Sequence, residues 1–282
     1  MRNGLQTLAV VLLAAACLAA HDTWLVPERF RVEPYQTVKV ALNTSEDFPA
    51  SEAAPAPDRV ARFAVVTRMT SAKHPGIALT STVENTTEPA TNYRVEGKSL
   101  VAEVLPGEGL TMVLAVTHPR LIVLKPEIFH EYLTEEGLEE IAAARAARGQ
   151  DKADGRERYS KITKLALCAA EEGGADFRKP LDLHVEIVPE DNPCSLRVGG
   201  ALRVRVLFQE KPLAGKWVGA GYAGVHGHKY PVWVKTDAEG RATIPLNRPG
   251  AWFVRTLHMI PSTEFEDADW QSWFSTFTFE VR

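Results

Sequence analysis

Short runs in which apolar and polar residues alternate dominate the first part of the chain. They cover residues 30–32, 37–42, 61–66 and 110–116, and loops rich in proline and alanine separate them. Alternation over such short runs, with turn residues between them, is typical of half-buried β-strands. The pattern therefore predicts an antiparallel β-domain over residues 21–123.

The same alternation returns more strongly toward the C-terminus. The runs cover residues 181–189, 202–208, 217–222, 232–237, 242–246, 250–258 and 273–281. Some seven strands spaced by turns over about 100 residues fit a β-sandwich. We therefore expect a β-sandwich domain over residues 180–282.

The middle of the chain has a different pattern. Residues 126–170 are rich in helix formers, above all in the Ala-, Glu- and Arg-rich stretch 139–148. Apolar residues recur at helical spacing in 156–165, after a polar break at 149–155, which predicts a second amphipathic helix. The fold class predicted is mainly β, with two β-sandwich domains of immunoglobulin or transthyretin type and a small helical insertion over residues 124–172 between them.

An apolar segment with a small-residue end opens the chain. Residues 1–20 have a basic start, an apolar run at 8–13 and the end Leu18-Ala19-Ala20, which is the organisation of a secretory signal peptide. Cleavage after Ala20 would make His21 the first residue of a periplasmic protein. Its free α-amine and imidazole could together chelate one transition metal ion. Ala14-Ala15-Ala16-Cys17 resembles a lipobox, so a lipid anchor at Cys17 is the alternative.

The composition excludes several classes of function. The formal net charge is −4 and no basic block occurs, so nucleic acid is not an expected partner. No second apolar run approaches the roughly 18–20 residues of a membrane span. The sequence has no Gly-x-Ser-x-Gly elbow, phosphate-binding loop or HExxH motif. We therefore expect a protein that is neither transmembrane nor an enzyme.

Two cysteines remain once the expected signal peptide is removed. An even number of cysteines in an exported chain favours a disulfide, here between Cys168 and Cys194. The alternative is two separate buried thiols. A metal-binding role is less favoured, because the two residues lack CxxC spacing.

Four stretches resemble one family of exported bacterial proteins. Residues 20–27, Ala-His-Asp-Thr-Trp-Leu-Val-Pro, are similar to its AHxxWLxP opening, and residues 129–138, 156–164 and 236–258 match in the same order. The chain thus resembles the DUF4198 family, whose members are often described as nickel-uptake-related. The resemblance implies a periplasmic protein of β-sandwich type associated with transition-metal uptake. His130 and His184 depart from the family pattern and are not carried over as ligands.

The histidines supply the candidate metal ligands, because imidazole suits nickel, copper and zinc. His21 and His258 form the leading pair, since both fall in family-like motifs. His226 and His228 are the second candidates, because residues two apart share a face of a strand. Asp22 could add a carboxylate. Nickel is the expected metal, and copper or zinc are the alternatives.

These observations predict a periplasmic transition-metal-binding protein that supports metal uptake or delivery, with an inner-membrane metal transporter as a partner. The first alternative is a non-catalytic recognition module that binds glycan or a partner protein at the cell surface. Its candidate platform is a set of five tryptophans: Trp217, Trp233, Trp252, Trp270 and Trp273. The second alternative is an enzyme in which copper bound at His21 activates oxygen.

Overall fold

The computed structural model describes residues 21–68, 82–85, 93–227 and 229–282. The expected signal peptide over residues 1–20, Cys17 within it, and His228 lie outside the described residues.

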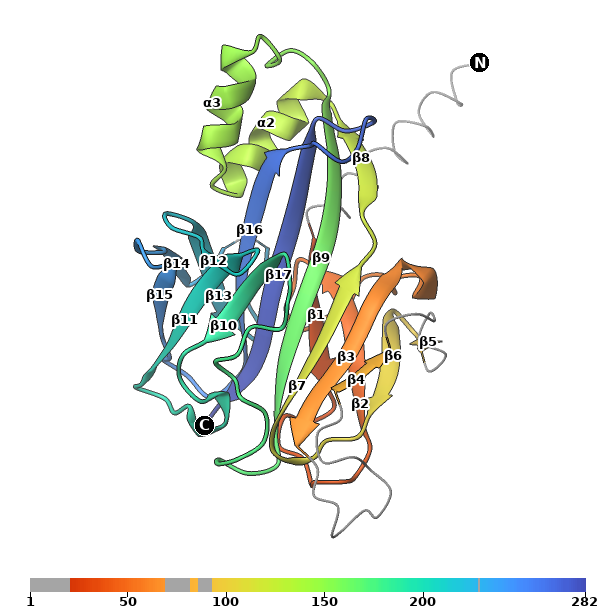
Figure 1. Cartoon of the computed structure of the whole chain (residues 1–282), viewed down its shortest axis with the longest axis vertical. Coiled ribbons are helices and arrows are strands. Elements are labelled where there is room, and N and C mark those ends of the chain that lie inside the picture. Colours follow the sequence, from red (N-terminus) through yellow and green to blue (C-terminus); the bar gives the residue numbers. More distant parts are fainter. Residues whose placement is uncertain (1–20, 69–81, 86–92, 228) are drawn as a thin grey trace.

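The described chain is mainly β, as the sequence predicts (Figure 1). Its first half contains β1 (Asp22–Pro27), β2 (Val38–Ser45), η1 (Pro57–Arg59), β3 (Val60–Arg68), β4 (Thr82–Asn85), β5 (Arg94–Glu96), β6 (Ser99–Val104), β7 (Glu108–Thr117), β8 (Arg120–Leu124), α2 (Pro126–Glu135) and α3 (Glu139–Ala147). Its second half contains β9 (Gly155–Cys168), β10 (Val185–Pro189), η2 (Pro193–Ser195), β11 (Ala201–Phe208), β12 (Lys211–Pro212), β13 (Trp217–Tyr222), β14 (Val232–Lys235), β15 (Arg241–Pro245), β16 (Gly250–Pro261) and β17 (Trp270–Val281).

A nine-stranded sheet forms the centre of the molecule. Its strand order is β14-β13-β16-β17-β9-β7-β3-β4, and β8 also pairs with β9. The long strands β9, β16 and β17 lie side by side in the middle (Figure 1). The pairing of β17 with β9 is parallel, whereas the other pairings of this sheet are antiparallel.

Two smaller sheets cover opposite faces of the central sheet. The sheet β1-β2-β6-β5 packs on what we call the first face, where it meets Val113, Leu165 and Leu167. The sheet of β10, β11, β12 and β15 packs on the second face, against Ile162 and Ala166. Adjacent residues of a strand point to opposite faces, so β7 and β9 contribute to both cores. The two predicted sandwiches therefore share their middle layer.

The two helices lie at one end of the long strands (Figure 1). Phe129 and Leu133 of α2 and Ile141 of α3 pack with Leu257 and Phe274 of the central sheet. The helices thus cover the first face where the sheet β1-β2-β6-β5 does not reach. They occupy residues 126–147 only.

The prediction of a helix over 156–165 was wrong, because these residues belong to strand β9. Tyr159, Ile162 and Leu165 recur every three residues, which imitates a helical stripe. In the structure β9 is buried on both faces, so the alternation that marks a half-exposed strand is missing. Its lysines, which suggested a solvated helix face, are buried as well: Lys161 and Lys164 are each less than 5% exposed.

Candidate metal site around His21

Strand β1 holds His21 in a fixed position. β1 pairs on one side with β2, with Asp22 opposite Ser45. On its other side the hydroxyls of Thr276 and Thr278 of β17 donate hydrogen bonds to the carbonyls of Thr23 and Leu25, both at 2.6 Å. These bonds satisfy backbone acceptors that an edge strand would otherwise leave without a partner.

A buried lysine completes this anchoring. Lys161 Nζ donates a hydrogen bond of 2.9 Å to the carbonyl oxygen of His21. Burial lowers the pKa of Lys161 to about 7. The backbone of His21 is therefore attached to the central sheet, and its side chain does not sit on a loose tail.

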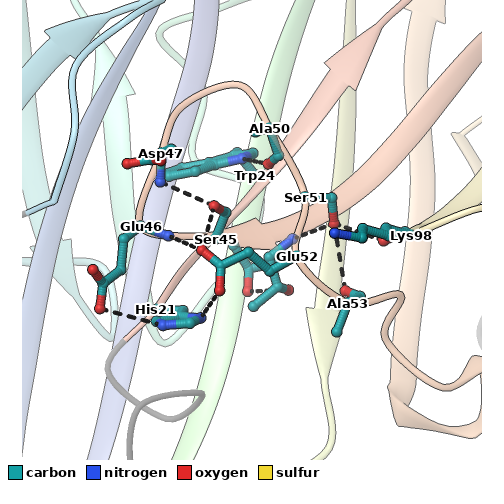
Figure 2. A network of polar contacts seen from close by, with 12 residues as sticks. His21, Trp24, Ser45, Glu46, Asp47, Ala50, Ser51, Glu52, Ala53 and Lys98 are labelled. Atoms are coloured by element: carbon teal, nitrogen blue, oxygen red, sulfur yellow. Dashed lines mark hydrogen bonds and ion pairs between the residues drawn. The ribbon is translucent and has the colours of Figure 1, made fainter.

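The imidazole of His21 faces two carboxylates. His21 is 4% exposed, and its Nε2 lies 3.3 Å from Glu46 Oε1 while its Nδ1 lies 3.7 Å from Glu52 Oε2 (Figure 2). The second distance is too long for a hydrogen bond, and Nδ1 has no hydrogen-bond partner among the described residues. Both carboxylates are about half exposed, at 47% and 48%. Within the described residues, the ring thus presents a buried nitrogen without a hydrogen bond beside two half-exposed carboxylates.

The loop that carries these carboxylates is itself ordered by side chains. Ser45 Oγ donates to Glu52 Oε1 at 2.9 Å and accepts from the amide of Asp47 at 3.0 Å (Figure 2). The amide of Glu46 donates to Glu52 Oε1 at 3.4 Å. The loop therefore folds back on the end of β2, which brings Glu46 and Glu52 to the same imidazole.

The structure places His226 against the same loop. His226 Nδ1 lies 3.0 Å from Asp47 Oδ1, and the two residues form an isolated β-bridge. The amide of Gly227 donates to the carbonyl of Glu46 at 3.1 Å. His226 is exposed. Two of the sequence-predicted ligands, His21 and His226, therefore contact the same acidic loop.

His258 does not join His21. It lies on β16 three residues after Arg255, whose side chain points to Asp22 on the first face. Because side chains alternate along a strand, His258 points to the second face, where its ring meets Phe208 at 4.5 Å. Burial lowers the pKa of His258 to about 4. The expected pairing of His21 with His258 across one ion is not the arrangement found, because the central sheet separates the two rings.

Asp22 serves an ion-pair network instead of standing free as a ligand. Its carboxylate lies 3.0 Å from Arg255 Nε, and the hydroxyl of Tyr230 donates to it at 3.1 Å. Arg255 also contacts Glu136 at 2.6 Å. Asp22, Glu136 and Arg255 are all less than 4% exposed. We call these three residues the buried triad; it ties β1 to β16 and to the residue that follows α2.

Another buried carboxyl lies close to the triad. Tyr132 donates to Glu157 at 3.2 Å, and Ser272 forms a second short hydrogen bond to it. Burial raises the pKa of Glu157 to about 7. Glu157 and Lys161 both stand on β9 and point toward the first face, so this part of the core holds several ionisable groups.

The remaining site predictions fall as follows. Cys168 and Cys194 are joined by a disulfide that links the end of β9 to η2. Trp252, Trp270 and Trp273 lie in the core, whereas Trp217 and Trp233 are half-buried and stack at 5.3 Å.

Among the described residues, no three His, Cys, Asp or Glu side chains are grouped closely enough to form a preassembled metal site. In the described part of the chain, no helix is long and apolar enough to span a membrane.

Sequence comparison decides the family. The family model described as "Domain of unknown function (DUF4198)" matches residues 18–260. The chain belongs to the DUF4198 family. None of the curated proteins matches it.

Solved structures offer only distant likenesses to this DUF4198 protein. The D0-D1 domain of intimin covers 92% of this chain and 97% of its own length, at 10% identity and a TM-score of 0.19. Trypsin-activated alpha-2-macroglobulin from Escherichia coli covers 93% of this chain with 18% of its own, at 12% identity and a TM-score of 0.22. Likenesses at this level say nothing about what the DUF4198 protein binds.

Sequence reasoning missed the residues that surround His21 in this DUF4198 protein. Glu46 and Glu52 lie in a loop that carries no ligand motif, so their approach to the imidazole depends on how the loop folds. Lys161 stands among other charged and polar residues and gave no such signal, whereas Arg255 could have been singled out as a charge within a strongly apolar strand. A charge in such a strand is expected to be paired.

Proposed function

We propose that this protein binds a divalent transition metal in the periplasm, nickel in the first place, and supports its uptake or delivery to an inner-membrane transporter. The observation that carries the proposal is the environment of His21. Its imidazole is buried, its Nδ1 has no hydrogen-bond partner among the described residues, and its nearest charged neighbours are Glu46 and Glu52.

Removal of residues 1–20 would complete this donor set. It would add the α-amine of His21 beside Nδ1, and one residue would then offer two nitrogens to one ion. Glu46 and Glu52 could each supply an oxygen, and the positive charge of the ion would offset the two carboxylates. His226, held by Asp47 on the same loop, is the next ligand within the described structure.

The kind of donor favours nickel or zinc over Cu(I). Amine, imidazole and carboxylate groups suit divalent ions, whereas Cu(I) prefers thiolate and thioether sulfur. Cys168 and Cys194 are consumed in a disulfide, and Met259 is buried in the core under the helices. Divalent copper and zinc remain the alternatives to nickel, and a titration has to compare the affinities of the three ions.

The fixed backbone and the half-exposed carboxylates fit reversible binding. β1 is held by Lys161, Thr276 and Thr278, so the nitrogens of His21 need little reorganisation. Glu46 and Glu52 are half exposed, so an ion can reach both carboxylates from solvent. A carrier that releases its metal needs such a partly open coordination sphere.

The test compares two forms of the protein, one that begins at His21 and one with a single alanine added before it. Calorimetric titration with nickel, zinc and copper(II) should give one-to-one binding to the first form. The added alanine should weaken binding about a hundredfold, since it removes the chelating amine from His21. Replacing both carboxylates, Glu46→Gln with Glu52→Gln, should weaken binding as well, whereas the exposed control Glu28→Gln should not.

Two outcomes would overturn the assignment. Equal binding by the two forms would move the site to His226 and His228. No binding by either form would reject the metal-binding proposal. Mass spectrometry of the exported protein checks the premise, because its mature form must begin at His21.

A recognition role is the second candidate, and one observation favours it. The half-buried rings of Trp217 on β13, Trp233 on β14 and Tyr230 just before β14 form a stacked row, with 5.3 Å between neighbouring centroids. If no metal binds, this row is the surface to test against glycans, with Trp233→Ala as the variant.

A further inference from the structure

The outer face of the sheet that contains β11 and β15 carries a cluster of arginines. Along both strands the even-numbered residues Val204, Val206 and Ile244 are buried in the core. The odd-numbered residues therefore point away from the central sheet. Four arginines line a surface cavity of about 370 Å³ there: Arg178, Arg203, Arg205 and Arg241. We call this cavity the arginine groove.

The strand pairing places two of these charges face to face. Arg205 of β11 lies directly opposite Arg241 of β15 in the antiparallel register. Like charges at directly opposite positions destabilise a sheet. The pairing of Arg205 with Arg241 therefore lowers the stability of the fold unless a negative group lies between the two guanidinium groups.

The carboxylates of the groove balance only part of its charge. Arg203 pairs with Asp191 at 3.0 Å, and Arg241 pairs with Glu190 at 3.2 Å, with Glu239 farther away at 3.9 Å. Arg178 donates to the carbonyl of Glu190, which carries no charge. Neither Arg178 nor Arg205 has an ion-pair partner within the described part of the chain.

Arg205 carries the buried donor of the groove that lacks a hydrogen-bond partner among the described residues, and this donor is its Nε. A buried donor without a partner costs free energy that a bound acceptor would recover. Arg178 stands at the rim of the same cavity, and its guanidinium lies over the ring of Phe177 at 4.5 Å, which restricts its position.

We infer that the arginine groove binds a phosphoryl group. The two guanidinium groups without a carboxylate supply two positive charges, and a phosphate monoester carries about −1.5 to −2 near pH 7. The planar fork of arginine matches phosphate oxygens with two parallel hydrogen bonds. The inference goes beyond the proposed metal function, because the groove lies over the second face of the central sheet and His21 lies on the first.

The test is a calorimetric titration of the protein that begins at His21 with inorganic phosphate. The ionic strength is kept constant with sodium chloride, and EDTA is present so that no metal contributes. The wild-type protein should bind one phosphate saturably. Arg205→Ala should weaken binding about tenfold or more, and Arg205→Lys should lose a smaller part, because it keeps the charge but not the fork.

Two further variants separate a site from general positive charge. Arg94→Ala removes an exposed, ion-paired arginine on β5 and should leave phosphate binding unchanged. Glu190→Gln removes a competing carboxylate from the groove and should tighten binding severalfold. A variant that merely damaged the fold would not tighten binding.

A second probe identifies the source of the phosphoryl group. Glycerol 3-phosphate should bind more tightly than inorganic phosphate if the natural ligand is an organic phosphate, and less tightly if it is free phosphate. Either order supports the inference. Absence of saturable binding, or equal weakening by Arg205→Ala and Arg94→Ala, would overturn it.

Discussion

At the scale of single residues, the buried charges set this protein apart from an ordinary β-sandwich. Arg255 is 1% exposed and contacts both Asp22 and Glu136. Removing charges from water costs free energy, and ion pairs and hydrogen bonds offset this cost only when each buried charge keeps its partners. The triad therefore makes the stability of β1 depend on one guanidinium group. That group pairs with Asp22, the residue next to His21 in the candidate metal site.

Removing that guanidinium should be strongly destabilising. Arg255→Met leaves the carboxylates of Asp22 and Glu136 buried without a cation, and we expect the free energy of unfolding to fall by about 3–5 kcal/mol. Urea denaturation measures the change. Arg156→Met, which breaks an exposed pair with Asp269, is the control and should have little effect. A small loss in Arg255→Met would show that water or rearrangement solvates the carboxylates.

The pH dependence of stability should carry the mark of Lys161 and Glu157. The pKa of Lys161 is about 7 in the fold against 10.5 ordinarily, so the unfolded chain binds more protons between these values and stability rises with pH there. The pKa of Glu157 is about 7 against 4.5, so the folded chain binds more protons between these values and stability falls as pH rises from 4.5 to 7. These two groups alone would give a minimum near pH 7, but His258, with a pKa of about 4 against 6.5 ordinarily, adds a rise over pH 4 to 6.5 that opposes the Glu157 contribution.

Two variants separate these contributions. Lys161→Met should remove the rise above pH 7, and Glu157→Gln should remove the fall below it. Each contribution changes the free energy of unfolding by up to about 1.4 kcal/mol per pH unit. Urea denaturation at a series of pH values, read as the difference between variant and wild type, isolates each limb. Parallel curves for wild type and Lys161→Met would contradict the burial of a neutral lysine.

At the scale of elements, close packing fixes the position of the helices. Gly137 lies between α2 and α3 with a φ of 67°, and a Cβ there would lie 2.2 Å from Trp217 Cδ1. Gly149 lies after α3 with the same φ, and nothing lies within 4 Å of the equivalent position. The two glycines therefore share a backbone conformation and differ in their surroundings.

This pair provides an internally matched experiment. Gly149→Ala should cost about 1 kcal/mol, the cost of a left-handed conformation for alanine. Gly137→Ala should cost about 1–3 kcal/mol more, because Trp217 and the loop must also move. Thermal denaturation with tryptophan fluorescence checks both the stability and the shift of Trp217. Equal costs would mean that the helices adjust freely.

Strand predictions were better than helix predictions, for a physical reason. The run 217–222 coincides with β13, and 110–116 lies within β7. The stretch 156–165 failed because β9 has a core on each side, so its residues show no alternation. A helix and a doubly buried strand cannot be told apart by apolar spacing alone.

At the scale of the whole molecule, the shared central sheet couples the two halves of the chain. β17 pairs with β9 along nine register positions, and β9 precedes the predicted boundary at residue 180. The core on the second face includes Met112 and Ile162 from the preceding part of the chain. We therefore expect the predicted C-terminal domain to need strands that lie outside its limits.

A fragment experiment tests this dependence. Residues 180–282, with Cys194→Ser to avoid an unpaired thiol, should fail to unfold cooperatively, because β17 lacks β9 and the core lacks one wall. The chain from His21 to Arg282 carrying Cys168→Ser and Cys194→Ser is the control and should unfold in one transition. Circular dichroism during urea denaturation measures both. A cooperatively folded fragment would establish an independent domain.

The sequence by itself determined the class of the fold and most strand positions, and it singled out His21 as a candidate ligand. The alternation of apolar and polar residues and the positions of turn residues are local properties, so they can be recognised in the sequence without knowledge of the tertiary contacts. Tertiary structure alone decided which side chains meet: it placed Glu46 and Glu52 beside His21, His226 beside Asp47 of the same loop, and His258 on the other face of the central sheet. Such contacts depend on strand order and register, which join residues far apart in the chain and leave no local pattern.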